Sequence, residues 1–354
     1  MERIQKLVSH MPEDMDAVLI DGPYNRLYYA GMHSTAGTLV ITRDAAYFII
    51  DSRYIEAAKK TVKGCEVILQ GKLYEQLAEI LKKHGVKRIG IEDTKTVDSY
   101  LSLKEKLPEV EVILDRRLGE IISRQRMIKE PCELQSIRRA QDYTDRAFTH
   151  ICEFIQPGMT EKEIALELEF YARKIGAEGA SFEYIVVSGP NGSLPHGHPT
   201  ERPVEKGDFI TMDFGCLADG YCSDMTRTIA VGEPGEEKRS IYETVLKANR
   251  AAMAAIRAGV SCKEIDQIAR DIITKAGYGE CFGHGLGHSV GLEIHENPRF
   301  SPTCEDICEA GLIMTDEPGI YLEGRFGVRI EDMVYVTEEG CINLTKSDKN
   351  LIIL

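Results

Sequence analysis

The sequence lacks the features that would place it in a membrane or on a secretory route. No run of apolar residues approaches the roughly eighteen that are needed to cross a bilayer. The N-terminal segment "MERIQKLVSHMPEDMDAV" carries charges where a secretory signal peptide would need a continuous apolar stretch. We therefore expect a cytoplasmic protein that does not bind a membrane.

Signals for a disulfide framework and for nucleic-acid binding are also missing. The ten cysteines are scattered and none forms a Cys-x-x-Cys pair, so we expect reduced thiols. Cys304 and Cys308 could share one helical face as metal ligands. However, no second cysteine pair or histidine lies near them, and structural or surface thiols are the simpler interpretation. The formal net charge of −14 and the absence of a dense Lys/Arg cluster argue against nucleic acid as a partner.

What is present indicates two domains, because 354 residues exceed one typical core. The first part alternates apolar strands with amphipathic helices, which predicts an α/β domain. The expected strands are residues 17–20, 37–42, 45–51 and 88–93, and a helix over residues 74–85 is expected to end at Gly85. The dipeptide Glu130-Pro131 indicates a break, with Pro131 in the first turn of a long helix. We place the domains at residues 1–125 and 126–354.

The second part contains an internal repeat. The segment "PGMTEKEIALELEFYARKIGAEG", from Pro157, aligns with "AGVSCKEIDQIARDIITKAGYGE", from Ala258. Each copy predicts a helix bounded by a capping box and a glycine: Thr160 with Glu163 and Gly176, then Ser261 with Glu264 and Gly277. Strand-rich segments follow both helices. We expect two pseudo-symmetric halves with a site between their sheets.

Two aspartates interrupt a segment that otherwise has the pattern of a buried hairpin. Asp213 lies inside the apolar run 209–214, and Asp224 follows an Asp-Gly turn. A turn centred on Ala218-Asp219 would make the two aspartates directly opposite, and a turn on Asp219-Gly220 would make them diagonal neighbours. In either register they share one sheet face, with β-carbons about 5 to 8 Å apart. Such a pair of like charges is costly unless a cation lies between them.

The second half repeats this arrangement with Glu317 and Glu331, between which the chain reverses at Gly324. The string "FGHGLGHSVGLEIHE" adds imidazoles among glycines that allow close backbone approach: His284, His288 and His295. Four carboxylates and one imidazole would balance the charge of two divalent cations about 3.5 to 4 Å apart.

The strings "IVVSGPNGSLPHG", "MDFGCLADGYCSDMTRT", "GHGLGHSVGLEIHE", "EPGIY" and "GVRIED" make residues 130–354 similar to the pita-bread metallopeptidases. This is the family of methionine aminopeptidase, aminopeptidase P and prolidase. The resemblance implies an α+β catalytic domain with internal pseudo-two-fold duplication over residues 126–354. Residues 1–125 resemble the N-terminal α/β domain of the creatinase, prolidase and aminopeptidase P branch, which simple methionine aminopeptidases lack.

The resemblance also implies roles for individual residues. The implied metal ligands are Asp213, Asp224, His288, Glu317 and Glu331. In the family pattern Asp224 and Glu331 bridge the two ions, Asp213 binds one, and His288 and Glu317 bind the other. The implied catalytic residues are Glu317 as proton shuttle, His196 and His295 in contact with the substrate or its tetrahedral intermediate, and His284 and Arg329 beside the ligands.

The implied activity is hydrolysis of the Xaa-Pro bond, in dipeptides or at peptide N-termini, by a homodimeric exopeptidase. The oxygen-rich ligand set favours Mn²⁺, while Co²⁺ or Zn²⁺ can occupy the same geometry. The alternatives are a methionine-aminopeptidase-like exopeptidase and a non-peptidase homologue, either a creatinase-like hydrolase or a binding protein. Asp316 departs from the family pattern, in which the residue before Glu317 is usually apolar. Strand alternation should point Asp316 away from Glu317.

Overall fold

The computed structural model describes residues 2–354. The chain forms two compact units, unit 1 (Met1–Arg126) and unit 2 (Met127–Leu354). No helix in the described residues is both long enough and apolar enough to span a bilayer.

Unit 1 is an α/β unit around a six-stranded sheet of order β4-β3-β2-β1-β5-β6. Its strands are β1 (Ala17–Ile20), β2 (Thr38–Thr42), β3 (Ala46–Ile50), β4 (Glu66–Leu69), β5 (Arg88–Ile91) and β6 (Glu111–Ile113). Its helices are α1 (Glu2–His10), α2 (Pro23–Ala30), α3 (Ile55–Thr61), α4 (Leu73–Lys83), α5 (Val97–Lys106) and α6 (Arg116–Met127). β2 pairs antiparallel with β1 and β3, whereas β3–β4, β1–β5 and β5–β6 are parallel.

The four strands predicted in unit 1 are present, and helix α4 ends before Gly85, which has a φ of +65°. Strands β4 and β6 were not predicted. β4 is only half-buried and β6 has three residues, so neither shows the continuous apolar pattern of the central strands. Leu77, Leu81 and Leu103 pack from the helices onto the buried sheet core.

Unit 2 contains two helix pairs and four small antiparallel sheets. The helices are α7 (Pro131–Phe154), α8 (Glu161–Lys174), α9 (Glu236–Ala255) and α10 (Cys262–Lys275), with short 3₁₀ turns η1 (Gly189–Ser193) and η2 (Gly279–Cys281). The strands are β7 (Ile185–Ser188), β8 (Phe209–Phe214), β9 (Leu217–Ala218), β10 (Tyr221–Cys222), β11 (Met225–Ala230), β12 (Gly287–Ser289), β13 (Glu296–Phe300), β14 (Ile313–Asp316), β15 (Gly319–Leu322), β16 (Phe326–Arg329), β17 (Asp332–Val336) and β18 (Cys341–Asn343).

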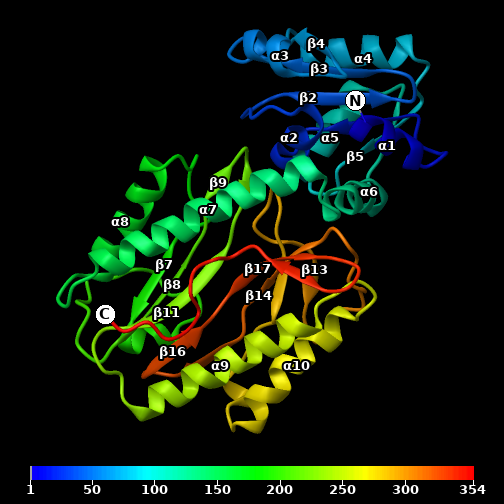
Figure 1. Cartoon of the computed structure of the whole chain (residues 1–354). Helices are drawn as coiled ribbons and strands as arrows, with labels where there is room; N and C mark the ends of the chain where they lie inside the picture. The colour runs from blue at the N-terminus through cyan, green and yellow to red at the C-terminus, as the bar shows by residue number, and fades with distance from the viewer. Residues whose placement is uncertain (1) are drawn as a thin grey trace. The chain divides into compact units, whose positions relative to one another are not determined.

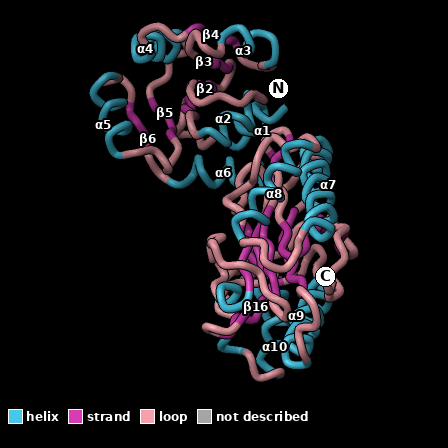
Figure 2. The backbone as a smooth tube through the Cα atoms, turned by 90° about the vertical axis from the view of Figure 1, so that its left-hand side faces the viewer, coloured by secondary structure: helices cyan, strands magenta, loops and turns pink. Residues whose placement is uncertain are grey.

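The sheets of unit 2 have the orders β11-β8-β7, β10-β9, β13-β12-β14-β17-β18 and β15-β16. Figures 1 and 2 show these strands between the helix pair α7–α8 and the helix pair α9–α10. Each half thus consists of two helices followed by antiparallel strands. α8 and α10 are the two copies of the sequence repeat, in the same place within each half.

The repeat helices begin and end as predicted, with one exception. The capping box of Thr160 and Glu163 forms at α8. The chain leaves α8 at Gly176 and α10 at Gly277, and both glycines have a positive φ. The predicted capping box of Ser261 is wrong, because the Ser261 side chain makes no cap hydrogen bond. The backbone there is instead paired with another segment, since Cys262 N–H donates to Asp306 O at 3.0 Å.

The suggestion that Cys304 and Cys308 share a helical face is also wrong, because residues 301–311 form no helix. Cys308 is buried, and its sulfur lies 3.8 Å from that of Cys262 in the core of unit 2. The predicted start of the long helix is confirmed. Pro131 is the first residue of α7, where its missing N–H leaves no hydrogen bond unmade.

Candidate metal centre and catalytic site

The first aspartate pair lies on a tight hairpin. Asp213 pairs with Thr226 across β8 and β11, and Asp219 and Gly220 form the turn with φ of +50° and +77°. This is the second of the two registers considered above, so Asp213 and Asp224 are diagonal neighbours. A Cβ added at Gly215, the position across from Asp224, would lie 1.8 Å from Ser223 O, so the strands can approach this closely only with glycine there.

The glutamate pair lies between two ladders of a longer hairpin. Asp316 pairs with Asp332 in β14–β17, and Gly319 pairs with Arg329 in β15–β16. Glu317 and Glu331 therefore lie opposite each other in the gap between the ladders. The chain reverses at Gly324, with a φ of +67°, as predicted.

Thr226 joins the two hairpins. Its carbonyl accepts a hydrogen bond from Glu331 N–H at 3.0 Å, and its hydroxyl donates to Glu331 Oε2 at 2.7 Å. Because Thr226 is also the strand partner of Asp213, it fixes the aspartate hairpin against the glutamate hairpin. The sequence interpretation overlooked Thr226, although it lies within the string "SDMTRT" that carried the resemblance.

His288 reaches the same place from the short strand β12. Its Nδ1 lies 3.1 Å from Ser289 O, and a carbonyl can only accept, so Nδ1 carries the proton. The lone pair of Nε2 is then free, 3.5 Å from Asp224 Oδ2 and 3.5 Å from Glu317 Oε1. Burial, aided by the charge of His295, lowers the pKa of His288 to about 3, so the ring is neutral at physiological pH. A neutral imidazole with a free Nε2 is the form that binds a metal.

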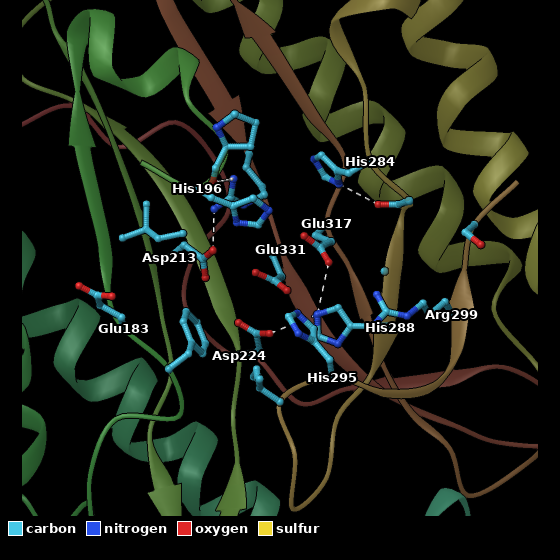
Figure 3. Close-up of a pocket in the computed structure, with 18 of the residues that line it drawn as sticks. Glu183, His196, Asp213, Asp224, His284, His288, His295, Arg299, Glu317 and Glu331 are labelled. Atoms are coloured by element: carbon cyan, nitrogen blue, oxygen red, sulfur yellow. Dashed lines mark hydrogen bonds and ion pairs between the residues drawn. The ribbon is translucent and has the colours of Figure 1, made fainter. Parts of the chain in front are cut away.

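The donor set fits divalent cations. Ligand atoms of Asp224, His288 and Glu331 all lie within 4.8 Å of one another. Asp213 Oδ1 is buried and has no hydrogen-bond partner among residues 2–354. Figure 3 shows the side chains of Asp213, Asp224, His288, Glu317 and Glu331 converging on one part of the cavity.

The pKa values of the carboxylates also indicate a site for cations. Burial, followed by the charges of Asp213 and Glu317, raises the pKa of Asp224 well above its usual range. Burial and the charge of Asp224 raise the pKa of Glu331 likewise. Burial raises the pKa of Glu317 to about 8, opposed by Arg329 and supported by Asp213. Cations bound here would reduce the repulsion between the carboxylates, which contributes to their raised pKa values.

A chain of hydrogen bonds runs behind the carboxylates. Arg329 donates to Asp213 Oδ2 at 2.6 Å and to the Tyr321 hydroxyl at 2.9 Å. Tyr321 lies 2.9 Å from His284 Nε2, and His284 Nδ1 lies 2.8 Å from Gly285 O. Since Gly285 O can only accept, Nδ1 carries the proton and Nε2 accepts from Tyr321. Tyr321 was not among the predicted site residues, although it ends the string "EPGIY".

The segment that presents His284 is held by α10. Asp266 is fully buried, accepts from Leu286 N–H at 2.9 Å and is paired with Arg270 at 2.8 Å. Arg270 in turn donates to His284 O at 2.8 Å. Leu286 O accepts from Glu317 N–H at 2.8 Å, so this support extends to a carboxylate of the candidate metal centre.

The carboxylates and histidines line a cavity of about 500 Å³. The ring of His295 lies 4.4 Å from that of His288, edge to face, and His196 enters the cavity from the loop after η1. All nine predicted site residues contribute to the cavity wall: His196, Asp213, Asp224, His284, His288, His295, Glu317, Arg329 and Glu331. Arg299 and Glu183 also line it and were not predicted, because the residues around them carry no ligand pattern.

Three residues weighed in the sequence interpretation lie outside the cavity wall. Cys216 and Cys222 are buried beside the aspartate hairpin. Asp316 is fully buried, and neither of its carboxylate oxygens has a hydrogen-bond partner in the described part of the chain. Burial, with the charge of Asp332, raises the pKa of Asp316 well above its usual range.

Both units of the chain are similar to known protein families. Residues 135–338 match the model of metallopeptidase family M24, and residues 3–128 match the creatinase/prolidase N-terminal domain. The chain is 38% identical over 353 residues to the Xaa-Pro dipeptidase of Pyrococcus furiosus, covering 99% of each protein. Two solved structures are similar over nearly their whole length. An Xaa-Pro dipeptidase from Bacillus anthracis has a TM-score of 0.96 at 43% identity, covering 100% of this chain and 99% of that one. An X-Pro aminopeptidase from Thermotoga maritima has a TM-score of 0.92 at 35% identity, covering 96% and 98%.

The match to the M24 model spans most of unit 2, and the second model accounts for almost all of unit 1. The expected pita-bread fold and the expected enzyme class are confirmed by these relatives. The chain belongs to metallopeptidase family M24, with a creatinase/prolidase N-terminal domain.

Proposed function

We propose that this protein is a dinuclear-metal exopeptidase that hydrolyses the Xaa-Pro bond of dipeptides or of peptide N-termini. The observation that carries the proposal is the convergence of four carboxylates and a neutral His288 on the wall of one cavity. The relatives support the bond specificity, since two of them are named Xaa-Pro dipeptidases and one an X-Pro aminopeptidase.

We propose that Asp213, Asp224, His288, Glu317 and Glu331 would hold the two ions. The oxygen-rich set favours Mn²⁺, with Co²⁺ or Zn²⁺ able to replace it. When bound, such cations supply Lewis acidity for the scissile carbonyl and lower the pKa of the attacking water. The bound metal and its stoichiometry can be read by elemental analysis of the purified protein.

The chain's own residues would handle the proton and the substrate. Glu317, whose carboxylate accepts from Thr315 Oγ1 at 3.3 Å, takes the proton of the attacking water and passes it to the departing nitrogen. This transfer is essential because the proline nitrogen is a tertiary amide without N–H and leaves only when protonated. His196 and His295, on the cavity wall, stabilise the developing oxyanion or position the peptide.

The alternatives are less well supported. A methionine aminopeptidase would not need the creatinase/prolidase N-terminal domain matched by residues 3–128. A creatinase-like hydrolase or a binding protein would not need all five metal-ligand positions, and each is filled here by a carboxylate or an imidazole. A homodimer and a cytoplasmic location remain proposals, the first of which sedimentation analysis can test.

The test is hydrolysis of Ala-Pro and Ala-Pro-Ala by chelator-stripped protein to which Mn²⁺, Co²⁺ or Zn²⁺ is restored. Metal-dependent cleavage of the dipeptide alone would identify a dipeptidase, and comparable cleavage of the tripeptide an aminopeptidase. Met-Ala serves as the competing substrate, and faster turnover of Met-Ala than of Ala-Pro would favour the methionine aminopeptidase alternative. Failure to cleave any of these peptides with every metal would overturn the proposal.

A further inference from the structure

Glu161 is a buried carboxylate outside the candidate metal centre. It is the first residue of α8, directly after the N-cap Thr160, where an acidic side chain is normally exposed to solvent. Its relative exposure is 0%, whereas Glu163 of the same first turn is exposed. An ionised carboxylate is retained in such a position only when its oxygens are satisfied by donors.

Both oxygens of Glu161 are satisfied, and all the donors lie in one segment. Oε1 accepts from Ser188 N–H at 2.6 Å, from the Ser188 hydroxyl at 2.8 Å and from Asn191 Nδ2 at 3.2 Å. Oε2 accepts from Thr200 N–H at 2.9 Å, from the Thr200 hydroxyl at 2.6 Å and from Asn191 Nδ2 at 3.1 Å. One carboxylate therefore joins the beginning and the end of residues 188–200.

Residues 188–200 run from the last residue of β7 through the loop that carries His196 into the cavity. Apart from the 3₁₀ turn η1, the loop has only local turns, with Leu194 N–H bonded to Asn191 O and Gly197 N–H to Leu194 O. No hydrogen bond within the described residues holds the imidazole of His196 itself. The position of this ring therefore depends on where the loop backbone is held.

The loop has further attachments besides Glu161. Gly324 N–H donates to Ser193 Oγ at 3.2 Å, and Lys162 N–H donates to Thr200 O at 3.2 Å. Another attachment lies on the side of the metal centre. Arg329 donates to Pro195 O at 3.2 Å, one residue before His196. The base of the loop, in contrast, is held by Glu161, with help from Arg202, which donates to the Ser188 hydroxyl at 2.7 Å. Removing the acceptor at Glu161 would leave the buried N–H and hydroxyl of Ser188 and the partly buried donors of Asn191 and Thr200 without this partner, and the loop would have to move to satisfy them.

We infer that Glu161 is a positioning residue for the reaction, because its carboxylate fixes the loop that places His196 against the substrate. This inference rests on the proposed function and adds to it a residue far from the metal ligands in the sequence. Both carboxylate oxygens of Glu161 accept several charge-assisted hydrogen bonds, so a neutral amide cannot replace this side chain.

The test compares Glu161→Gln with wild type on Ala-Pro in the presence of Mn²⁺. The amide keeps the size of the side chain but turns one acceptor oxygen into a donor that faces other donors. We expect kcat/KM to fall about tenfold or more, since small displacements of catalytic groups are costly. The loss should divide between kcat and KM in the same way as that of His196→Ala. Bound metal should be unchanged.

A double-mutant cycle separates positioning from general loss of structure. If Glu161 acts through His196, Glu161→Gln should cost little or nothing further in a His196→Ala background. Glu163→Gln is the matched control, because Glu163 caps the same helix through Thr160 but does not touch the loop. Its activity should stay within about twofold of wild type.

Thr200→Val keeps the inference testable if Glu161→Gln fails to fold. It removes one donor to Oε2, and a smaller loss in the same kinetic parameter as His196→Ala is expected. Wild-type activity in Glu161→Gln, or losses from Glu161→Gln and His196→Ala that simply multiply, would overturn the inference. Inactive wild-type protein would instead count against the proposed function.

Discussion

Arg329 and Asp213 form an ion pair that leaves half of the carboxylate free. Arg329 Nη2 donates to Asp213 Oδ2 at 2.6 Å, while Oδ1 is buried without a hydrogen-bond partner in the described residues. The guanidinium therefore orients Asp213 from behind and leaves one oxygen available at the cavity wall. The same guanidinium also donates to Tyr321, so one side chain orients both a proposed ligand and the hydrogen-bond chain to His284.

Arg329→Lys should impair catalysis although it preserves the charge. A lysine ammonium lacks the planar fork that serves Asp213 and Tyr321 together, so Asp213 would lose its fixed orientation. We expect kcat/KM for Ala-Pro to fall on the order of tenfold to a hundredfold. Arg325→Lys is the control, because Arg325 pairs with Glu237 at the exposed surface and should change activity by less than about twofold. Full activity in Arg329→Lys would contradict the role of the ion pair.

Asp224→Asn should weaken metal binding. The amide removes one negative charge from the proposed ligand set, and we expect at least about a tenfold loss in metal affinity together with lost peptidase activity. Asp219→Asn is a suitable comparison, since Asp219 belongs to the same hairpin and asparagine tolerates its φ of +50°. Metal content by elemental analysis distinguishes them. Unchanged metal content in Asp224→Asn would remove Asp224 from the site.

The geometry of the two hairpins could be predicted only in part from the sequence. Asp213 and Asp224 could be placed on one sheet face because strand alternation has a strict period, but the choice between two registers depended on whether Asp219 could adopt positive φ. The structure places the turn on Asp219-Gly220. Glu317 and Glu331 could be expected at one site, yet that they lie opposite each other between two ladders follows from the tertiary arrangement.

Residues that act through tertiary contacts were harder to predict. Thr226 and Tyr321 carry no ligand or acid-base pattern, and their importance appears only when they bridge segments distant in sequence. Ser261 has the local pattern of a capping box, but backbone pairing of Cys262 with Asp306 replaces it. Local sequence patterns thus predicted the helices and strands, whereas the contacts of Thr226 and Tyr321 and the start of α10 depend on long-range hydrogen bonds.

His284 should make the stability of the metal-free protein depend on pH. Burial, with the charge of Arg329, lowers its pKa in the folded state from 6.5 to about 4. Between about pH 4 and 6.5 the unfolded chain therefore binds more protons at this residue, so the contribution of His284 to the free energy of unfolding should rise with pH and level off above 6.5. The raised pKa values of Glu317 and Glu331 contribute with the opposite sign, so the effect of His284 is read as a difference between two proteins. The contribution is at most about 3 kcal/mol, and less with partial solvent screening.

The corresponding measurement is urea unfolding of chelator-treated wild type and His284→Gln across this pH range. The stability of wild type relative to the variant should rise between pH 4 and 6.5, because glutamine takes up no proton. His198→Gln, at an exposed histidine, controls for the substitution of histidine by glutamine itself. Identical slopes for wild type and His284→Gln would show that His284 is not the group responsible.

Arg299 should determine whether the substrate needs a free carboxylate. It lines the cavity together with His295, and its guanidinium forms no ion pair within the described residues, whereas that of Arg329 is engaged by Asp213. The C-terminal carboxylate of a dipeptide needs such a cation, while a longer peptide carries a neutral amide at the same position. Arg299→Met should therefore raise KM for Ala-Pro about tenfold and leave Ala-Pro-amide nearly unchanged. Equal effects on both substrates would mean that Arg299 does not read the carboxylate, and an aminopeptidase groove would then be the better description of the cavity.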